Sequence, residues 1–168
     1  MNKHTYVELN FDQESKDYFS SIVKEMVHED ELYFSDEVER IRGDVTGKLH
    51  LTLFYGLDAE EVNNPELKKF VDEINLKDLN LKFGYFRLFR GYQDMYKVLN
   101  IEVLDEDKKL LEIYNGLKLF KADEEYVQRE FKPHLTLAYV QPDYRFPYKF
   151  PRIDKEIIPE NIEIKVEK

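Results

Sequence analysis

KLHLTLFY at residues 48–55 returns as KPHLTLAY at residues 132–139. Six of the eight positions are identical, and the two copies lie half the chain length apart. Each copy also follows a segment whose apolar residues have helical spacing. A single duplication of this kind predicts two pseudo-symmetric lobes rather than a solenoid of many short repeats.

Strand geometry indicates which side chains of the repeat share a surface. Successive side chains of a strand point to opposite faces, so residues two apart lie on the same face. Each copy is therefore expected to present a lysine, a histidine and a threonine in a row, with leucines directed into the core. The rows are Lys48, His50 and Thr52 in the first copy, and Lys132, His134 and Thr136 in the second.

Two histidines and two hydroxyls suit phosphodiester chemistry. Imidazole has an unperturbed pKa of about 6.5, so at neutral pH one ring can act as a base while its partner acts as an acid. Threonine hydroxyls can donate hydrogen bonds to non-bridging phosphate oxygens and stabilise the transition state. One His-x-Thr segment alone would be an ordinary strand, and the prediction depends on the two matched copies.

The paired HLT segments at residues 50–52 and 134–136 resemble the signature of the two-histidine (2H) phosphoesterase superfamily, and the resemblance covers nearly the whole chain. That group includes bacterial RNA 2′,3′-cyclic phosphodiesterases, also called 2′-5′ RNA ligases, enzymes that cut 2′-5′ oligoadenylates, and phage nucleases that degrade cyclic oligonucleotide signals. The resemblance implies His50 and His134 as general acid and base, and Thr52 and Thr136 as phosphate ligands. It also implies a bilobal fold with a central cleft, no catalytic metal and no other cofactor.

The remaining pattern predicts an α+β fold with antiparallel or mixed sheets, formed by a single domain over residues 1–168. GYQD at 91–94 separates two alternating segments, which is typical of a hairpin. Loops are expected at 29–47 and 142–152. Strands are predicted over 5–11, 48–57, 79–90, 95–104, 132–140 and 161–167, and helices over 12–27, 64–75 and 108–120.

Four further residues are candidates for substrate binding. Lys48 and Lys132 could offset substrate charge, or they could be solvated strand ends. In the loop after the second motif, Tyr144 could stack on a base, as aromatic side chains do in single-strand binders, and Arg145 could contact a phosphate. The aromatic residues of this loop could equally hold it against the core.

Three other residues have weaker patterns. Tyr6 could line the cleft from the first strand. His4 and His28 have no threonine two positions on, and both are predicted to be surface histidines.

Composition limits the partners. The chain has 25 Lys and Arg against 35 Asp and Glu, a net charge of −10, and no cysteine. Long nucleic acids draw most of their affinity from basic side chains, so such a partner is not expected, whereas a nucleotide or short oligonucleotide is. No segment has the length of a membrane span or the form of a signal peptide. We therefore expect a cytoplasmic monomer without a metal site.

The sequence thus predicts a metal-independent phosphodiesterase acting on RNA-type bonds of a small or short substrate. A 2′,3′-cyclic phosphate, a 2′-5′ oligonucleotide and a cyclic oligonucleotide signal all remain open, the last as a phage anti-defence role. The alternatives are a catalytically inactive nucleotide- or RNA-binding module of the same fold, and an adaptor whose repeat is only structural.

Overall fold

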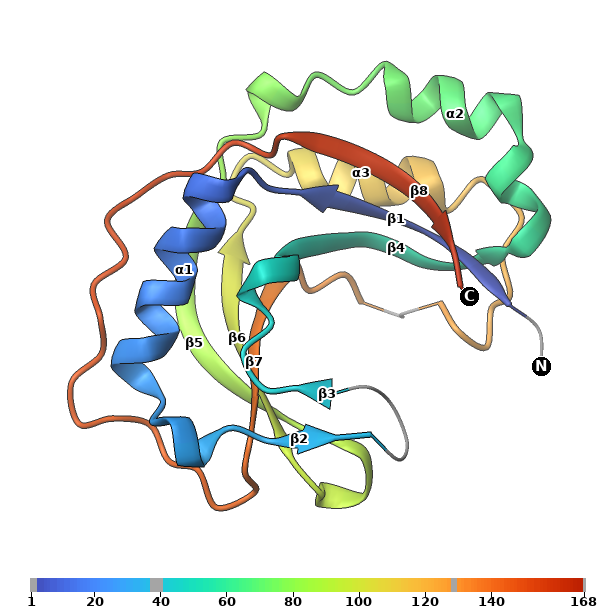
Figure 1. Ribbon diagram of the computed structural model, residues 1–168. Coiled ribbons are helices and arrows are strands. Elements are labelled where there is room, and N and C mark those ends of the chain that lie inside the picture. The colour runs from blue at the N-terminus through green and yellow to red at the C-terminus, as the bar shows by residue number, and fades with distance from the viewer. Residues whose placement is uncertain (1–2, 37–40, 128–129, 168) are drawn as a thin grey trace.

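Two three-stranded antiparallel sheets meet at the repeated strands (Figure 1). The computed structural model describes residues 3–36, 41–127 and 130–167. The first sheet has the order β4-β1-β8 and the second the order β5-β6-β7. Their strands are β1 (His4–Asn10), β4 (His50–Asp58), β8 (Asn161–Val166), β5 (Lys82–Arg90), β6 (Lys97–Leu104) and β7 (His134–Val140).

Three α-helices follow the predicted pattern: α1 (Gln13–Met26), α2 (Pro65–Asp72) and α3 (Lys109–Leu117). The Asp12 carboxylate accepts a hydrogen bond from the backbone N–H of Ser15 and so caps α1. Asn64 caps α2, with Pro65 at its first position, as the start signal predicts. Short 3₁₀ turns complete the helical segments: η1 (Glu29–Glu31), η2 (Thr46–Lys48), η3 (Ala59–Asn63), η4 (Leu76–Asp78) and η5 (Tyr92–Asp94).

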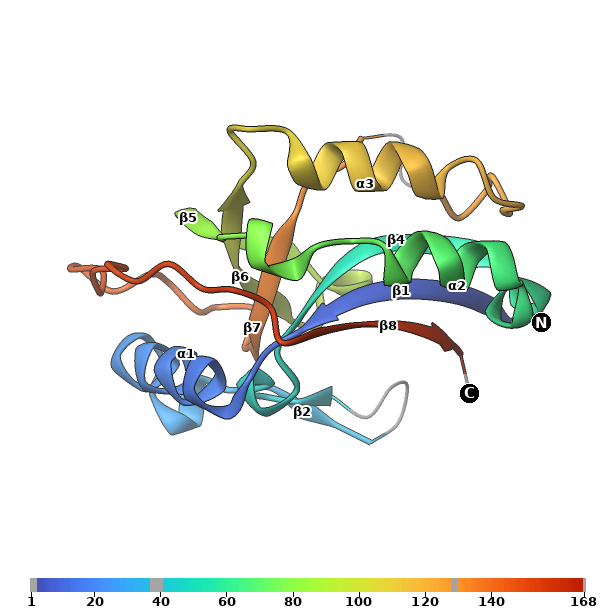
Figure 2. The same cartoon turned by 90° about the horizontal axis from the view of Figure 1, so that it is seen from above.

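The two lobes share a strand–helix–strand unit, β1-α1-β4 in one and β6-α3-β7 in the other. Helix α1 contacts β7 and helix α3 contacts β4, so each helix covers the sheet of the opposite lobe. The ring of Tyr114 on α3, for example, lies 5.3 Å from that of Phe54 on β4. Figure 2 shows the two helices on opposite sides of the molecule. This exchange ties the lobes together and confirms the predicted two-lobed α+β fold.

The core is formed by the residues that the alternation assigns to it. Leu51, Leu53, Leu135 and Leu137, the leucines of the two motif strands, are all 1 % exposed or less. Since such side chains each contribute about 1.5–3 kcal/mol when buried, the motif strands are fixed firmly in place.

Two predictions fail. The 29–47 segment, expected as a loop, contains a two-stranded ribbon of β2 (Phe34–Ser35) and β3 (Ile41–Arg42), whose connection at 37–40 lies outside the described residues. The strands are too short for an alternation pattern to reveal them. His4, expected at the surface, is only 3 % exposed, whereas His28 is exposed as predicted.

No helix in the described part of the chain is long and apolar enough to cross a membrane.

Candidate active site

Strands β4 and β7 give the two HLT segments the same local geometry. The pairing of β1 with β4 shifts register at Leu53, and the pairing of β6 with β7 shifts register at Leu137. Both leucines directly follow the motif threonine. A β-bulge bends a strand and increases its twist, and here the same irregularity occurs in both copies. The two copies therefore share a backbone irregularity as well as a sequence.

Both motif histidines are held in one orientation by the backbone. His50 Nδ1 lies 2.9 Å from the carbonyl oxygen of Lys48, and His134 Nδ1 lies 2.8 Å from that of Lys132. Because a carbonyl only accepts, Nδ1 must carry the proton in each ring. The Nε2 atom of each imidazole is therefore the one that can gain or lose a proton during a reaction.

Around His50 the structure places a nearly buried ion pair. Glu8 on β1 is 4 % exposed, and its Oε1 lies 2.5 Å from Lys165 Nζ on β8. The other oxygen, Oε2, lies 3.8 Å from His50 Nε2. A protonated His50 thus faces a carboxylate whose charge is already shared with a lysine.

The surroundings of His134 are different. The Phe89 ring meets the imidazole edge-on at 5.3 Å, and the Arg87 guanidinium lies over the Phe89 ring, 5.1 Å from its centre. Burial is the main cause that lowers the pKa of His134, and the charges of Arg87 and His50 lower it further. The hydrogen bond to the Lys132 carbonyl opposes this. The neutral form of His134 is favoured, and the two imidazoles lie within electrostatic reach of each other.

The threonines face different partners across their strands. Thr52 is exposed and pairs with Glu8, whereas Thr136 is half-buried and pairs with Asn100. Asn100 is fully buried and accepts a hydrogen bond from Arg87 Nε at 3.3 Å. The Nη2 atom of Arg87 is buried without a hydrogen-bond partner among the described residues.

A cleft of about 1390 Å³ opens over the first sheet. It is lined by His50 and Thr52, but His134 and Thr136 are not among its lining residues. Lys132 lies instead at a smaller cavity of about 300 Å³, together with Arg87. The first lobe therefore supplies the larger binding surface. Tyr6 lines this cleft, as the sequence suggested.

The lysines do not stand in the predicted rows. Strands β4 and β7 begin at the histidines, and Lys48 lies in the 3₁₀ turn η2 before β4. The backbone carbonyls of Lys48 and Lys132 anchor the imidazoles, and this contact does not depend on the lysine side chains. The Lys48 side chain still lines the cleft, whereas Lys132 lies 3.7 Å from the carboxylate of Glu130.

The prediction for Tyr144 is corrected by its burial. Tyr144 is 2 % exposed, and its hydroxyl donates a hydrogen bond to the carbonyl of Met26 at the end of α1. It holds the loop against the core, so its ring has no open face for a base. Arg145 is exposed and follows the end of β7 opposite to His134, and it lines neither of these two cavities.

Glu8, Lys165, Arg87 and Asn100 were missed by sequence reasoning. A signal for Glu8 was present, because polar residues alternate along β1 on the face that pairs with the motif. Nothing in the sequence alone indicates that β8, at the far end of the chain, brings Lys165 to Glu8. Among the described residues, no group of three or more His, Cys, Asp or Glu side chains is arranged to hold a metal ion.

No protein-family model and no curated protein matches the sequence. Among solved structures, E. coli LigT complexed with phosphate matches with a TM-score of 0.57 at 11 % identity, over 99 % of this chain and 95 % of that one. The same protein complexed with NADP+ gives a TM-score of 0.56 at 14 % identity, over the same shares of the two chains. Kluyveromyces marxianus Usb1 with uridine monophosphate has a TM-score of 0.48 at 13 % identity, over 83 % of this chain and 71 % of that one. The chain therefore has a fold similar to that of E. coli LigT.

Proposed function

We propose that this protein is a metal-independent phosphodiesterase that cleaves RNA-type bonds in a short nucleotide substrate, with His50 and His134 as its acid–base pair. One observation carries the proposal. Each histidine is anchored through Nδ1 to a backbone carbonyl, on one of two neighbouring strands, with a threonine two residues on. A structural histidine has no need of this arrangement twice.

The unequal surroundings favour a division of roles. His134 is favoured as the neutral ring, which suits the general base, and its pKa is lowered chiefly by burial. A protonated His50 faces Glu8, which suits the general acid. Acid and base acting on opposite sides of phosphorus are what in-line displacement requires.

For a 3′-5′ linkage, the 2′-hydroxyl is the nucleophile and the 5′-oxygen is the leaving group. His134 Nε2 takes the proton of the 2′-hydroxyl, whose oxygen forms a bond to phosphorus. The bond from phosphorus to the 5′-oxygen breaks, and His50 Nε2 gives that oxygen its proton. The products are a 2′,3′-cyclic phosphate and a 5′-hydroxyl. The hydroxyls of Thr52 and Thr136 donate to the non-bridging oxygens during this step.

The substrate class follows from charge and fold. A chain of net charge −10 does not suit a long polyanion, whereas a short one can be bound by local contacts. Solved structures of LigT contain phosphate and NADP+, which supports a nucleotide as the ligand of a protein with a similar fold. A cyclic oligonucleotide signal belongs to this class, and its cleavage would be an anti-defence activity. We further propose that the protein acts as a single-domain monomer in the cytoplasm.

Turnover in the presence of EDTA tests this proposal. The substrates are 2′,3′-cyclic mononucleotides, cyclic di- and trinucleotides, 2′-5′ oligoadenylate and RNA with a 2′,3′-cyclic end. At least one is expected to be cleaved, and His50→Ala and His134→Ala are each expected to lose about a hundred- to ten-thousandfold in rate. His28→Ala, an exposed histidine outside the motifs, is the matched control.

Three results would contradict the proposal. Activity that disappears in EDTA and returns with magnesium or manganese would overturn the metal-independent mechanism. A histidine variant that keeps more than about a tenth of the wild-type rate would exclude the assigned role. Tight binding of nucleotides without cleavage of any substrate would favour the inactive binding module.

A further inference from the structure

The cleft extends well beyond His50, along β1. At one end it is lined by Lys16, Lys48 and His50, and at the other by Tyr55 and Glu167. A strand rises about 3.3 Å per residue, so β1 gives the cleft a length of roughly 20 Å. A nucleotide joined to the reacting phosphate occupies only part of this length.

Two tyrosines line the far part of the cleft. Tyr6 on β1 and Tyr55 on β4 are paired in register, and their ring centres lie 6.1 Å apart at an interplanar angle of 32°. Burial and the hydrogen bond to Glu167 raise the pKa of Tyr55 to about 12, so its hydroxyl stays protonated at neutral pH. The pair presents aromatic surface to a cleft that is otherwise lined mainly by polar side chains.

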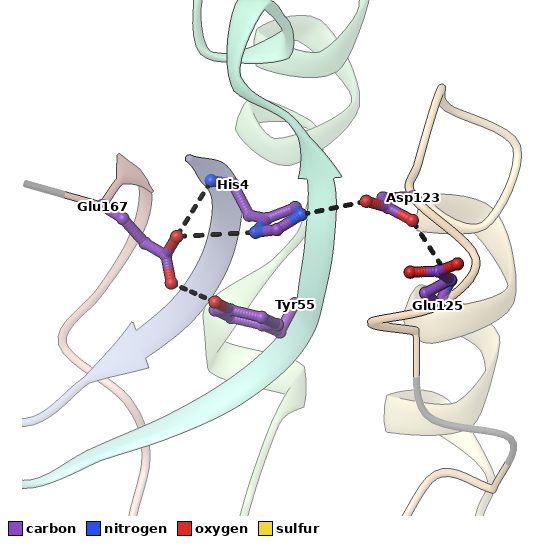
Figure 3. A network of polar contacts seen from close by, with 5 residues as sticks. All are labelled: His4, Tyr55, Asp123, Glu125 and Glu167. Atoms are coloured by element: carbon purple, nitrogen blue, oxygen red, sulfur yellow. Dashed lines mark hydrogen bonds and ion pairs between the residues drawn. The ribbon is translucent and has the colours of Figure 1, made fainter. Parts of the chain in front are cut away.

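A network of polar contacts fixes the position of Tyr55 (Figure 3). Its hydroxyl donates to Glu167 on the segment after β8. The other carboxylate oxygen of Glu167 accepts the backbone N–H of His4 at 3.0 Å and lies 3.5 Å from the His4 ring. The opposite ring nitrogen of His4 lies 3.4 Å from Asp123, in the loop after α3. Because His4 is buried, this network joins β1, the segment after β8 and the loop after α3, and it fixes the orientation of the Tyr55 ring.

Chain geometry separates this aromatic pair from the reacting phosphate. Tyr55 follows His50 by five residues on one strand, a path of roughly 16 Å. One nucleotide step covers about 3.4 Å along a stacked strand and about twice that when the strand is extended. The base next to the scissile phosphate therefore falls short of Tyr55, whereas two extended steps, together with the reach of the tyrosine side chain, bring a third base to it.

Net charge does not explain why a ligand would enter the cleft. Four lysines and four glutamates line the cleft as a whole, so the charge of its lining is balanced. The lysines are Lys3, Lys16, Lys48 and Lys165, and the glutamates are Glu8, Glu160, Glu163 and Glu167. Affinity must come from local contacts, and aromatic stacking on a base is one contact that the lining offers.

We propose that Tyr6 and Tyr55 form a subsite for a nucleobase beyond the reacting nucleotide, so that the protein prefers oligonucleotides of three or more nucleotides. The inference deepens the proposed phosphodiester cleavage and rests on it for the identity of the ligand. It assigns the His4–Glu167 network a positioning role, since the network touches Tyr55 and not the reacting atoms.

Binding of oligodeoxynucleotides tests the subsite without turnover, because they lack the 2′-hydroxyl nucleophile. The dissociation constants of di-, tri- and tetranucleotides are measured for wild type, Tyr55→Leu, Tyr55→Phe and Tyr148→Leu. Stacking on one base contributes 1–3 kcal/mol, so wild type is expected to bind the trinucleotide roughly 5- to 150-fold more tightly than the dinucleotide. Tyr55→Leu is expected to lose this increase and to bind the dinucleotide like wild type.

The variants separate the ring from its anchor. Tyr55→Phe keeps the ring and loses the hydrogen bond to Glu167, so part of the increase should remain. Tyr148 is fully exposed in the loop after β7, and its leucine variant should behave as wild type. If Tyr55→Leu fails to fold, Tyr6→Leu carries the same expectation.

The outcomes distinguish the two proposals. Equal affinity for di- and trinucleotides in wild type, or an equal loss for both in Tyr55→Leu, would overturn the subsite even if the protein cleaves RNA-type bonds. A trinucleotide preference that depends on Tyr55, in a protein that cleaves no substrate of the panel, would support the subsite and overturn the proposed catalysis.

Discussion

Replacing Lys165 by methionine would leave the carboxylate of Glu8 without its main partner inside the cleft wall. The two charges are 2.5 Å apart, and at an effective dielectric constant of about 20 their gross attraction is about 7 kcal/mol. Most of this offsets the desolvation of Glu8, which is 4 % exposed. Removing one partner of a buried pair typically costs about 3–5 kcal/mol. His50, at 3.8 Å, can share the remaining charge, so we expect Lys165→Met to lower the free energy of unfolding by about 2–4 kcal/mol.

Glu8→Gln should cost less, about 1–2 kcal/mol, because the side chain of Lys165 is 39 % exposed and its ammonium can turn to water. The double variant removes both charges, so its loss should be smaller than the two single losses together by about 1–3 kcal/mol. Urea unfolding of the four proteins at pH 7 measures all three differences. Losses that simply add, or a Lys165→Met protein as stable as wild type, would refute the assignment of Glu8 as a buried charge that depends on Lys165.

Three further predictions concern the motif and the network behind Tyr55. Thr52→Val and Thr136→Val should each lower kcat by about ten- to a hundredfold, less than loss of a histidine, because each removes one hydrogen-bond donor to a charged group. A large fall in melting temperature would show instead that the threonine has a structural role. Because burial lowers the pKa of His134, its neutral form persists into more acidic solution, and the acidic limb of the pH profile of kcat/KM should lie below about pH 6.5. An acidic limb above that pH would argue against His134 as the base. The hydrogen bond from Tyr55 lowers the pKa of Glu167. The stability that the ionised Glu167 provides is therefore complete above about pH 4.3 and is lost as the pH falls through the pKa of the folded state. The melting temperature of Glu167→Gln should depend less on pH between 5 and 3 than that of wild type.

Much of the fold could be predicted because local rules determine it. The leucines of the motif strands occupy the core as their alternation predicts, and Asp12 and Asn64 cap the helices that their positions indicate. The hairpin around residues 91–94 joins β5 to β6 in the same way. In each case the decisive interactions lie within a few residues of one another, so sequence spacing is sufficient evidence.

Two of the errors occur where distant segments meet. His4 is buried because β8, β4 and the loop after α3 converge on it, and no local pattern indicates this. Tyr144 is held by the carbonyl of Met26, far earlier in the chain, so its role in the loop could not be distinguished from base stacking. The lysines before the motif histidines lie outside the strands because β4 and β7 begin at the histidines, two residues after the repeat begins in the sequence. Strand parity therefore does not apply to these lysines, although the Lys48 side chain still lines the cleft with His50 and Thr52.

The repeat itself cannot determine which histidine is the acid. Both imidazoles have the same threonine neighbour, the same bulge and the same backbone anchor, so these features are neutral between the two roles. Burial and the Arg87 charge, which lower the pKa of His134, are one part of the difference, and the adjacent strands are another, because a carboxylate on β1 pairs with one threonine and an amide on β6 pairs with the other. Exchanging these two side chains, as Glu8→Asn with Asn100→Glu, would leave the motifs intact. If the neighbouring strands set the roles, this exchange should shift both limbs of the pH–rate profile, and a profile that does not move would locate the asymmetry elsewhere.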